Sequence, residues 1–280
     1  MIPLDQYDKW SVLLEENAGL FLSKKELEEF ATISEIERNN QLKEILEKPI
    51  ANFTMVNEVY FRARWAEVLK MLYSQSNLNL LEIATGDADM IPQVLDRTHP
   101  NSHYITVNMN KILNVSLLNK TKNLHIIMDL VNDDAANIVK HLGEEKVDII
   151  AFQHAVNDVI QAILCSREGI DTTDSDWMEV LPKMIKILQK ETSENTLEQH
   201  AKIPFLSLLT ELLKVLKKDG MIVMNHYMFQ LDLDWGYPPE LFEKMVPIIR
   251  EWIKELKGCT EVFFQGFDTN WWIYLKKTES

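Results

Sequence analysis

Hydrophobic positions change their spacing along the chain at about residue 78. Before that point they recur every three or four residues, as in 57–73, which predicts helices throughout residues 1–75. Ser23 followed by Glu26 has the spacing of a helix-capping box in this region. After residue 78, short apolar runs alternate with helical patterns, which predicts parallel strands connected by helices.

Five apolar runs have the length and composition of buried strands: 78–84, 102–109, 123–130, 146–156 and 221–227. Helical patterns follow them at 89–98, 111–121, 133–143, 208–220 and 239–256. Two further strands, joined by a turn around Asp268, predict an antiparallel hairpin at the end of the sequence. The predicted fold is therefore α/β, with a doubly wound, mostly parallel seven-stranded sheet, an antiparallel C-terminal hairpin and an N-terminal helical cap.

The same pattern divides the chain into two predicted domains. Residues 1–75 form a helical cap or lid, and residues 76–280 form a Rossmann-like domain. The interval between the fourth and fifth strands is long for a simple crossover, so we expect an insertion at about 160–205. Such an insertion would lie over the carboxyl ends of the strands, where open α/β sheets bind their ligands.

The net charge, the apolar runs and the cysteines indicate which binding partners and which cellular location to expect. The formal net charge is −14, and binding to a phosphate backbone needs clustered Lys and Arg, so we expect no nucleic-acid partner. No apolar run approaches the roughly 20 residues of a membrane span, and no signal-peptide pattern occurs. Cys165 and Cys259 form no paired motif. We expect a cytoplasmic protein with no membrane partner, while the oligomeric state stays open, a homodimer included.

The loop after the first predicted strand, EIATGDAD (82–89), contains one glycine and two closely spaced aspartates. A dinucleotide usually needs a GxGxxG run for its pyrophosphate, and only Gly86 is available here. Asp87 and Asp89 would repel a pyrophosphate by about 4 kcal/mol at ~4 Å and an effective dielectric near 20. A Walker-type phosphate loop is absent from the sequence. The loop therefore favours a cationic ligand over a phosphate-bearing one.

From about residue 56 to its end, the chain resembles the class I S-adenosylmethionine-dependent methyltransferases. The resemblance rests on Glu82 and Gly86 in the first-strand motif, on LKKDGMIVM at the fifth strand and on the terminal hairpin. The family motif has an acid followed by three alternate glycines, and the first and third of these are Ala84 and Ala88 here. The resemblance implies S-adenosylmethionine, which is cationic, as the cofactor.

The resemblance also assigns contacts for this cofactor to the ends of the strands. It implies an acid on the ribose hydroxyls where this chain has Asn108, whose amide can still bond hydroxyls without charge assistance. It implies an acid on the adenine amine, which is present as Asp129. The expected cofactor-binding residues are Glu82, Ala84, Thr85, Gly86, Asn108, Met109, Asp129, Leu130 and Gln153.

Three residues at the ends of the fourth and fifth strands are candidates for catalysis. The ordinary pKa of a histidine side chain suits a general base, so His154 is a candidate for that role. Asp158, four residues later, would orient its imidazole. His226 ends the fifth strand and would face the same cleft. No third ligand follows a recognised metal-site spacing, so we expect no metal. The expected substrate contacts are Tyr60, Arg64, Asn157, Trp177 and Tyr227, with 230–240 as a further rim of the site.

These residues predict a methyltransferase that acts on a small molecule at oxygen or nitrogen. No cysteine closely follows the fourth strand and no NPPY-type run is present, which disfavours pyrimidine-carbon, amino-purine and protein-amide acceptors. Two alternatives stay open. The first is transfer of the cofactor's aminocarboxypropyl arm on the same fold, and the second is a binding protein that has kept the fold without catalysis.

Overall fold

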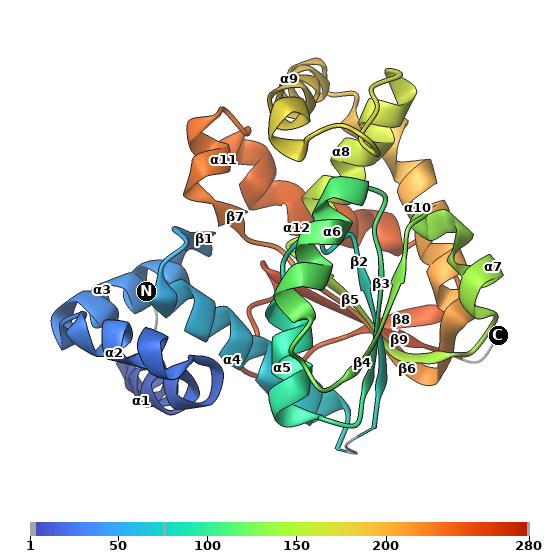
Figure 1. Ribbon diagram of the computed structural model, residues 1–280. Helices are drawn as coiled ribbons and strands as arrows, with labels where there is room; N and C mark the ends of the chain where they lie inside the picture. The colour runs from blue at the N-terminus through green and yellow to red at the C-terminus, as the bar shows by residue number, and fades with distance from the viewer. Residues whose placement is uncertain (1–3, 75–76, 279–280) are drawn as a thin grey trace.

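A seven-stranded sheet forms the centre of the molecule (Figure 1), with the strand order β4-β3-β2-β5-β6-β9-β8. The computed structural model describes residues 4–74 and 77–278, and the predicted domain boundary at 75 and 76 lies outside them. The strands of the sheet are β2 (Asn79–Ile83), β3 (His103–Val107), β4 (Ile127–Val131), β5 (Val147–Gln153), β6 (Leu216–Asn225), β8 (Cys259–Val262) and β9 (Trp272–Lys277).

The pairing of the strands confirms the predicted fold class. Strands β2, β3, β4, β5 and β6 run parallel to one another, whereas β9 lies between β6 and β8 and is antiparallel to both. Strand order reverses beside β2, which is flanked by β3 on one side and β5 on the other. This reversal is the topological switch point at which open α/β sheets bind ligands.

Helices cover both faces of the sheet because successive strand side chains point to opposite sides. Leu80 and Tyr104 pack on one face with α4 (Met55–Leu72) and α5 (Met90–Thr98). Leu81 and Ile105 belong to the larger core on the other face. That core includes residues of α7 (Ile138–Leu142), α8 (Val156–Arg167), α10 (Leu197–Val215) and α12 (Pro239–Ile253). Within the described residues, no helix is both long enough and apolar enough to cross a membrane.

The N-terminal region is helical except at one place. It contains α1 (Leu4–Phe21), α2 (Lys24–Thr32), α3 (Glu35–Glu47) and α4, and the predicted capping box of Ser23 and Glu26 begins α2. Between α3 and α4, β1 (Ile50–Ala51) pairs in parallel with β7 (Met228–Phe229). The prediction of helices alone was wrong here, because a two-residue strand is too short to show alternation. The pairing fastens the N-terminal helices to the segment after β6.

The crossover from β5 to β6 contains three helices: α8, α9 (Trp177–Glu194) and α10. The helix predicted over 208–220 begins earlier and ends at Val215, so Gly220 lies within β6 instead of closing the helix. The register against β5 shifts at this point. A Cβ on Gly220 would lie 2.9 Å from the carbonyl oxygen of Asp148, so this glycine permits a close approach of two strands.

Candidate functional site

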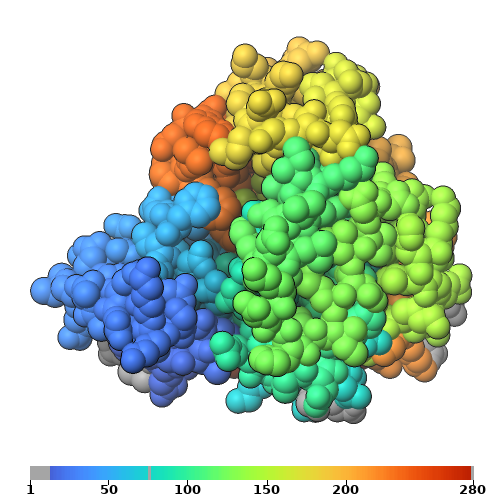
Figure 2. All heavy atoms as spheres, viewed as in Figure 1, coloured from blue at the N-terminus to red at the C-terminus, as the bar shows by residue number. Residues whose placement is uncertain are grey.

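A cavity of about 1260 Å³ opens at the carboxyl ends of the parallel strands. Figure 2 shows the surface hollowed where the N-terminal segment (blue), the segment around α6 (Lys111–Thr121, green), α9 (yellow) and the segment after β6 (orange) meet. The loops after β2, β3, β4 and β5 line it, together with residues of α4, α9 and α11 (Gln230–Asp234). A ligand bound there would touch parts of the chain that are far apart in sequence.

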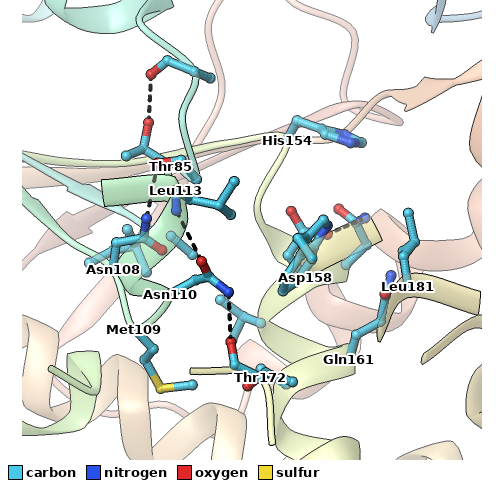
Figure 3. Close-up of a pocket in the computed structure, with 18 of the residues that line it drawn as sticks. Thr85, Asn108, Met109, Asn110, Leu113, His154, Asp158, Gln161, Thr172 and Leu181 are labelled. Atoms are coloured by element: carbon cyan, nitrogen blue, oxygen red, sulfur yellow. Dashed lines mark hydrogen bonds between the residues drawn. The ribbon is translucent and has the colours of Figure 1, made fainter. Parts of the chain in front are cut away.

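Two groups of side chains line the cavity on different sides. In Figure 3, Thr85, Asn108, Met109 and Asn110 come from the loops after β2 and β3 and lie on one side. His154, Asp158, Gln161 and Leu181 come from the end of β5, from α8 and from α9, and they lie on the other side. We call these the β2–β3 side and the α8 side of the cavity.

The loop after β2 has the backbone conformation expected of glycines, although it contains only one. Ala84 has φ 51° and Gly86 has φ 61°. The Ala84 N–H donates to the carbonyl of Val107 at 3.0 Å, which fixes the loop to the end of β3. A left-handed conformation costs an L-residue roughly 1–2 kcal/mol, and such strain persists mainly at functional sites. The loop therefore stores strain at Ala84.

Asn108 holds this loop from the end of β3. Its Nδ2 donates to the carbonyl of Gly86 at 2.9 Å, and only 7% of the residue is exposed. Its own N–H donates to the carbonyl of Val131 at the end of β4. An ionised carboxylate has no hydrogen to donate, so the bond to Gly86 requires the amide. The departure from the family's acid thus has a structural role in this chain.

The two aspartates of the loop are already paired, which weakens the predicted repulsion of a pyrophosphate. Asp87 accepts from Lys120 and Ser116, each at 2.7 Å. Burial raises the pKa of Asp87, but these hydrogen bonds outweigh burial and bring the pKa below its ordinary value. Asp89 accepts from Gln93 at 2.6 Å and lies 4.0 Å from Arg62. The loop alone therefore does not select a cation.

The acidity of the cavity comes from its whole lining. Eight carboxylates face three Lys or Arg side chains; these are Glu58, Asp87, Asp89, Asp133, Asp134, Asp158, Asp171 and Asp232 against Arg62, Lys120 and Arg167. Like charges in a partly desolvated space raise the local concentration of oppositely charged ligands. The site as a whole favours a positively charged ligand.

Glu82 lies within β2 and does not line the cavity. It accepts from the hydroxyl of Tyr104 at 2.7 Å and is 1% exposed. Burial raises the pKa of Glu82 to about 8. Its placement supports the strand below the loop, so the structure gives it no direct contact with a ligand in the cavity.

Asp129 and Leu130 also lie away from the cavity, which corrects their predicted placement at a strand end. β4 begins at Ile127 rather than at 123, so Asp129 falls in the middle of the strand and pairs with His103 at 2.8 Å. The residues after β4 that do line the cavity are Asp133 and Asp134. The resemblance assigns the acid to the end of the strand, but β4 continues for two residues beyond Asp129 to Val131.

The end of β5 places four of the predicted residues in the cavity: Gln153, His154, Asn157 and Asp158. Gln153 donates to the hydroxyl of Tyr227, which also lines the cavity, at 2.5 Å. The ring of His154 stacks on that of Tyr227 with centroids 4.4 Å apart. His154 has φ 56°, a conformation rare for non-glycine residues, and its N–H donates to Asn225 at 3.0 Å.

His154 and Asp158 do not form the predicted dyad. Nδ1 of His154 is buried and has no hydrogen-bond partner, whereas Asp158 accepts from Nδ2 of Asn157 at 3.0 Å. Burial lowers the pKa of His154 to about 4, so its ring is neutral at neutral pH. Burial, followed by the charge of Asp232, raises the pKa of Asp158 to about 8.

Tyr60, Arg64 and His226 line a separate, smaller cavity of about 300 Å³, so they were wrongly placed with the others. Residues two apart on a helix point in different directions, and it is Arg62 of α4 that reaches the large cavity. Burial lowers the pKa of His226 to about 3, and neither of its ring nitrogens has a hydrogen-bond partner. Among the described residues, no group of three His, Cys, Asp or Glu side chains is arranged to hold a metal ion.

Trp177 was predicted as a substrate contact, and it lines the large cavity as expected. Several other residues of this cavity were not predicted. Gln161 and Arg62 were missed, and Asp232 and Tyr237 were included only as part of the rim at 230–240. Among the described residues, five buried polar atoms of the cavity lining have no hydrogen-bond partner: Nε of Arg62, Nδ1 of His154, Oδ1 of Asn157, Oε1 of Gln161 and the hydroxyl of Tyr237. Unpaired buried polar atoms at this density point to a polar ligand.

Comparisons with known proteins find similarity to solved structures at low sequence identity. No protein-family model and no curated protein matches the sequence. A solved structure of a SAM-dependent methyltransferase from Aquifex aeolicus is 11% identical, with a TM-score of 0.47 over 75% of this chain and 87% of that one. The CurJ carbon methyltransferase is 12% identical, with a TM-score of 0.48 over 86% and 58%. The pyocyanin biosynthetic protein PhzM is 10% identical, with a TM-score of 0.46 over 80% and 57%.

At identities this low the likeness concerns the fold alone, and the chain's own sheet defines that fold. Parallel strands in the order β4-β3-β2-β5-β6, followed by an antiparallel strand inserted before the last, form the α/β fold of the class I S-adenosylmethionine-dependent methyltransferases.

Proposed function

We propose that this chain is an S-adenosylmethionine-dependent methyltransferase that acts on a small molecule at oxygen or nitrogen. The observation that carries the proposal is the large cavity at the switch point of the sheet, whose lining contains eight carboxylates and three Lys or Arg side chains. A ligand with a sulfonium and an ammonium group is complementary to such a lining, whereas a pyrophosphate is not.

The β2–β3 side of the cavity is the part that would hold the cofactor. The left-handed turns at Ala84 and Gly86 bring bare backbone close to the cavity, and the Cβ-free Gly86 leaves room for a ligand. Asn108 and Met109 line the same side, and Gln153 lies at the end of β5 beside them. When bound, S-adenosylmethionine supplies an electrophilic methyl group on its sulfonium sulfur.

The α8 side would then receive the methyl acceptor. Much of the rate of a displacement reaction comes from holding two reactants in line, and this chain offers a rigid set of groups for that purpose. The hydrogen bond from Gln153 fixes Tyr227, and the stacked ring of His154 is fixed in turn. Nε2 or Nδ1 of the neutral His154 can accept a proton that the acceptor loses, and Asn157 can orient the acceptor through its free Oδ1.

The walls of the cavity favour a small acceptor. Residues of α4, α9 and α11 enclose it, and the pairing of β1 with β7 joins two of these walls. Phe53, which follows β1, stacks on Phe229 of β7 with ring centroids 4.2 Å apart at the edge of the site. An enclosed, acidic site suits a small molecule better than a polyanionic nucleic acid.

Two glycine variants test the site of cofactor binding with a matched control. Gly86 and Gly258 both have positive φ, 61° and 83°, but Gly258 does not line the cavity. Gly86→Ala and Gly258→Ala should therefore lose similar stability, while only the first should bind the cofactor more weakly. S-adenosylmethionine at about 100 times its dissociation constant should stabilise the wild-type protein by about 2.7 kcal/mol, measured as a rise in melting temperature.

Two results would oppose the proposal. In the first, S-adenosylmethionine stabilises both variants equally; in the second, it does not stabilise the wild-type protein. The reaction products separate the alternatives on the same fold. Release of S-adenosylhomocysteine indicates methyl transfer, whereas release of methylthioadenosine indicates transfer of the aminocarboxypropyl arm. Binding without either product would indicate a non-catalytic protein.

A further inference from the structure

We propose that the α8 side of the cavity binds the ammonium group of a small amine, which is the methyl acceptor, between the carboxylates of Asp158 and Asp232. For transfer, the ammonium group would first lose one proton to the carboxylate of Asp158, and the freed lone pair of the nitrogen would form the bond to the methyl carbon as the sulfonium–methyl bond breaks and S-adenosylhomocysteine leaves. This inference rests on the proposed function for the role of the amine as acceptor, but the amine site itself is argued from the residues alone. Asp158 lies in the first turn of α8 and Asp232 in α11, and both line the cavity.

The two carboxylates are neighbours, and a third group lies beside them. The backbone N–H of Tyr237 donates to the carbonyl of Asp232 at 2.9 Å, which places the tyrosine next to α11. Burial raises the pKa of Tyr237 well above its ordinary value, and the charges of Asp158 and Asp232 raise it further. The charge of Asp232 likewise acts on Asp158. Two acids and a phenol therefore share one partly desolvated space.

No positively charged side chain of the described residues forms a salt bridge with Asp158 or Asp232. The three Lys and Arg side chains that line the cavity are paired elsewhere: Arg62 with Glu58, Lys120 with Asp87, and Arg167 with Glu191. An ionised acid without a countercharge is costly in such a space, and burial accordingly raises the pKa of Asp158 to about 8; an ammonium group between the two acids would stabilise both of them as carboxylates.

The uncharged groups around the acids select a donor-rich ligand. Oδ1 of Asn157 and Oε1 of Gln161 are buried without partners, and the two residues are 2% and 1% exposed. The bond from Nδ2 of Asn157 to Asp158 fixes which end of that amide stays free, and the free end is an acceptor. The hydroxyl of Tyr237, on a residue 1% exposed, is unpaired as well. An ammonium group carries up to three donors and no acceptor, which matches this set.

Aromatic side chains complete the site. Trp235 follows Asp232 by three residues, and Trp177 begins α9; both line the cavity. Aromatic faces attract ammonium groups and bind the apolar body of an amine at the same time. The geometry thus points to a small amine with an apolar or aromatic body rather than to an acid or a sugar phosphate.

The test uses phenethylamine as the probe and phenethyl alcohol as its uncharged counterpart. Each is titrated calorimetrically into the full-length protein, with and without S-adenosylhomocysteine, and S-adenosylhomocysteine is titrated by itself. The amine should bind at least about tenfold more tightly than the alcohol, and Asp158→Asn and Asp232→Asn should each remove most of that difference. Asp176→Asn is the matched control. Asp176 begins α9 but does not line the cavity, and an amide oxygen can keep its bond to the N–H of Met178, so amine binding should not change.

The outcomes separate this inference from the proposed function. Equal affinities of the amine and the alcohol, absence of saturable amine binding, or an equal effect of Asp176→Asn would overturn the amine site, even if S-adenosylhomocysteine binds. Loss of S-adenosylhomocysteine binding in Asp158→Asn and Asp232→Asn, with amine binding intact, would also overturn it, because the acids would then serve the cofactor's own ammonium. Amine binding that depends on both acids, without any binding of S-adenosylhomocysteine, would support the site and reject the methyltransferase.

Discussion

Replacing Asn108 with aspartate would give this chain the acid that its resemblance to class I methyltransferases leads one to expect after the second strand. In the structure, however, Nδ2 of Asn108 donates to the carbonyl of Gly86 at 2.9 Å in a nearly buried position. An ionised carboxylate cannot make that bond, and it would place a negative charge beside the carbonyl oxygen. We therefore expect Asn108→Asp to destabilise the protein although it restores the family pattern.

The magnitude follows from the lost bond. Leaving a buried carbonyl without its donor costs about 1–3 kcal/mol, so about 2 kcal/mol is expected. In a chain of this size, each kcal/mol lowers the melting temperature by about 2–4 °C, which gives a fall of about 4–8 °C. A protonated carboxyl can donate to Gly86 again, so the loss should shrink as the pH is lowered toward 4.

Thermal unfolding of the wild-type protein, Asn108→Asp and Asn108→Ala at pH 8 and at pH 4.5 would measure both effects. Alanine loses the same bond without adding a charge, so its deficit should not depend on pH relative to the wild type. If Asn108→Asp melts at the wild-type temperature at pH 8, the bond to Gly86 does not hold the loop and the argument about Asn108 fails.

Three further variants test the other groups of the site. Ala84→Gly should raise the free energy of unfolding by about 0.5 kcal/mol, because glycine relieves the left-handed strain at φ 51°; a loss of stability in denaturant titration would deny that strain. The pKa of Asp158, about 8 in the folded protein, lies above its ordinary value, so the folded state keeps a proton that the unfolded state loses above about pH 4. Wild-type stability should thus fall as the pH rises toward 8, and Asp158→Asn should gain about 3–4 kcal/mol relative to the wild type between pH 5 and pH 8; a constant difference would show that Asp158 is not desolvated. His154→Asn, chosen because Asn tolerates positive φ, should lower kcat by about tenfold or more and leave S-adenosylhomocysteine affinity nearly unchanged; a collapse of that affinity would make His154 a cofactor contact.

The sheet was predictable because its strands are short apolar runs between helical patterns. Buried parallel strands such as 79–83 and 147–153 are apolar on both faces, so they are visible without any knowledge of their partners. The antiparallel end of the sheet followed from two adjacent strands with a short connection. The position of β9 between β6 and β8 did not follow, since pairing depends on contacts that the sequence does not display.

The site was predictable in part from the ends of the strands. The predicted fourth strand ran three residues past the end of β5, yet Gln153, His154, Asn157 and Asp158 all line the cavity. The predicted third strand ended at 130, one residue before the end of β4, yet the acid assigned to the site, Asp129, lies in the middle of the strand, and the acids that line the cavity are Asp133 and Asp134. A strand boundary correct to one residue therefore does not fix which side chain reaches a site.

Residues contributed by distant segments were the hardest to predict. Arg62 rather than Arg64 faces the cavity, because the rotation of α4 is set by its packing on α5 and the sheet. Asp232 enters the site only because β7 pairs with β1 and turns α11 toward α8. Asp158 was expected to pair with His154 because it follows four residues later. That spacing brings two side chains together only when both lie within a helix, and His154 precedes α8.

Calorimetric titration of the wild-type protein with S-adenosylhomocysteine, followed by competition with S-adenosylmethionine, tests the central claim most directly. We predict saturable binding at one site per chain, displacement of one ligand by the other, and a clear loss of affinity in Gly86→Ala but not in Gly258→Ala. If neither compound binds at millimolar concentration, the acidic cavity at the carboxyl ends of the strands is not a site for this cofactor, and the assignment of methyltransferase activity is contradicted.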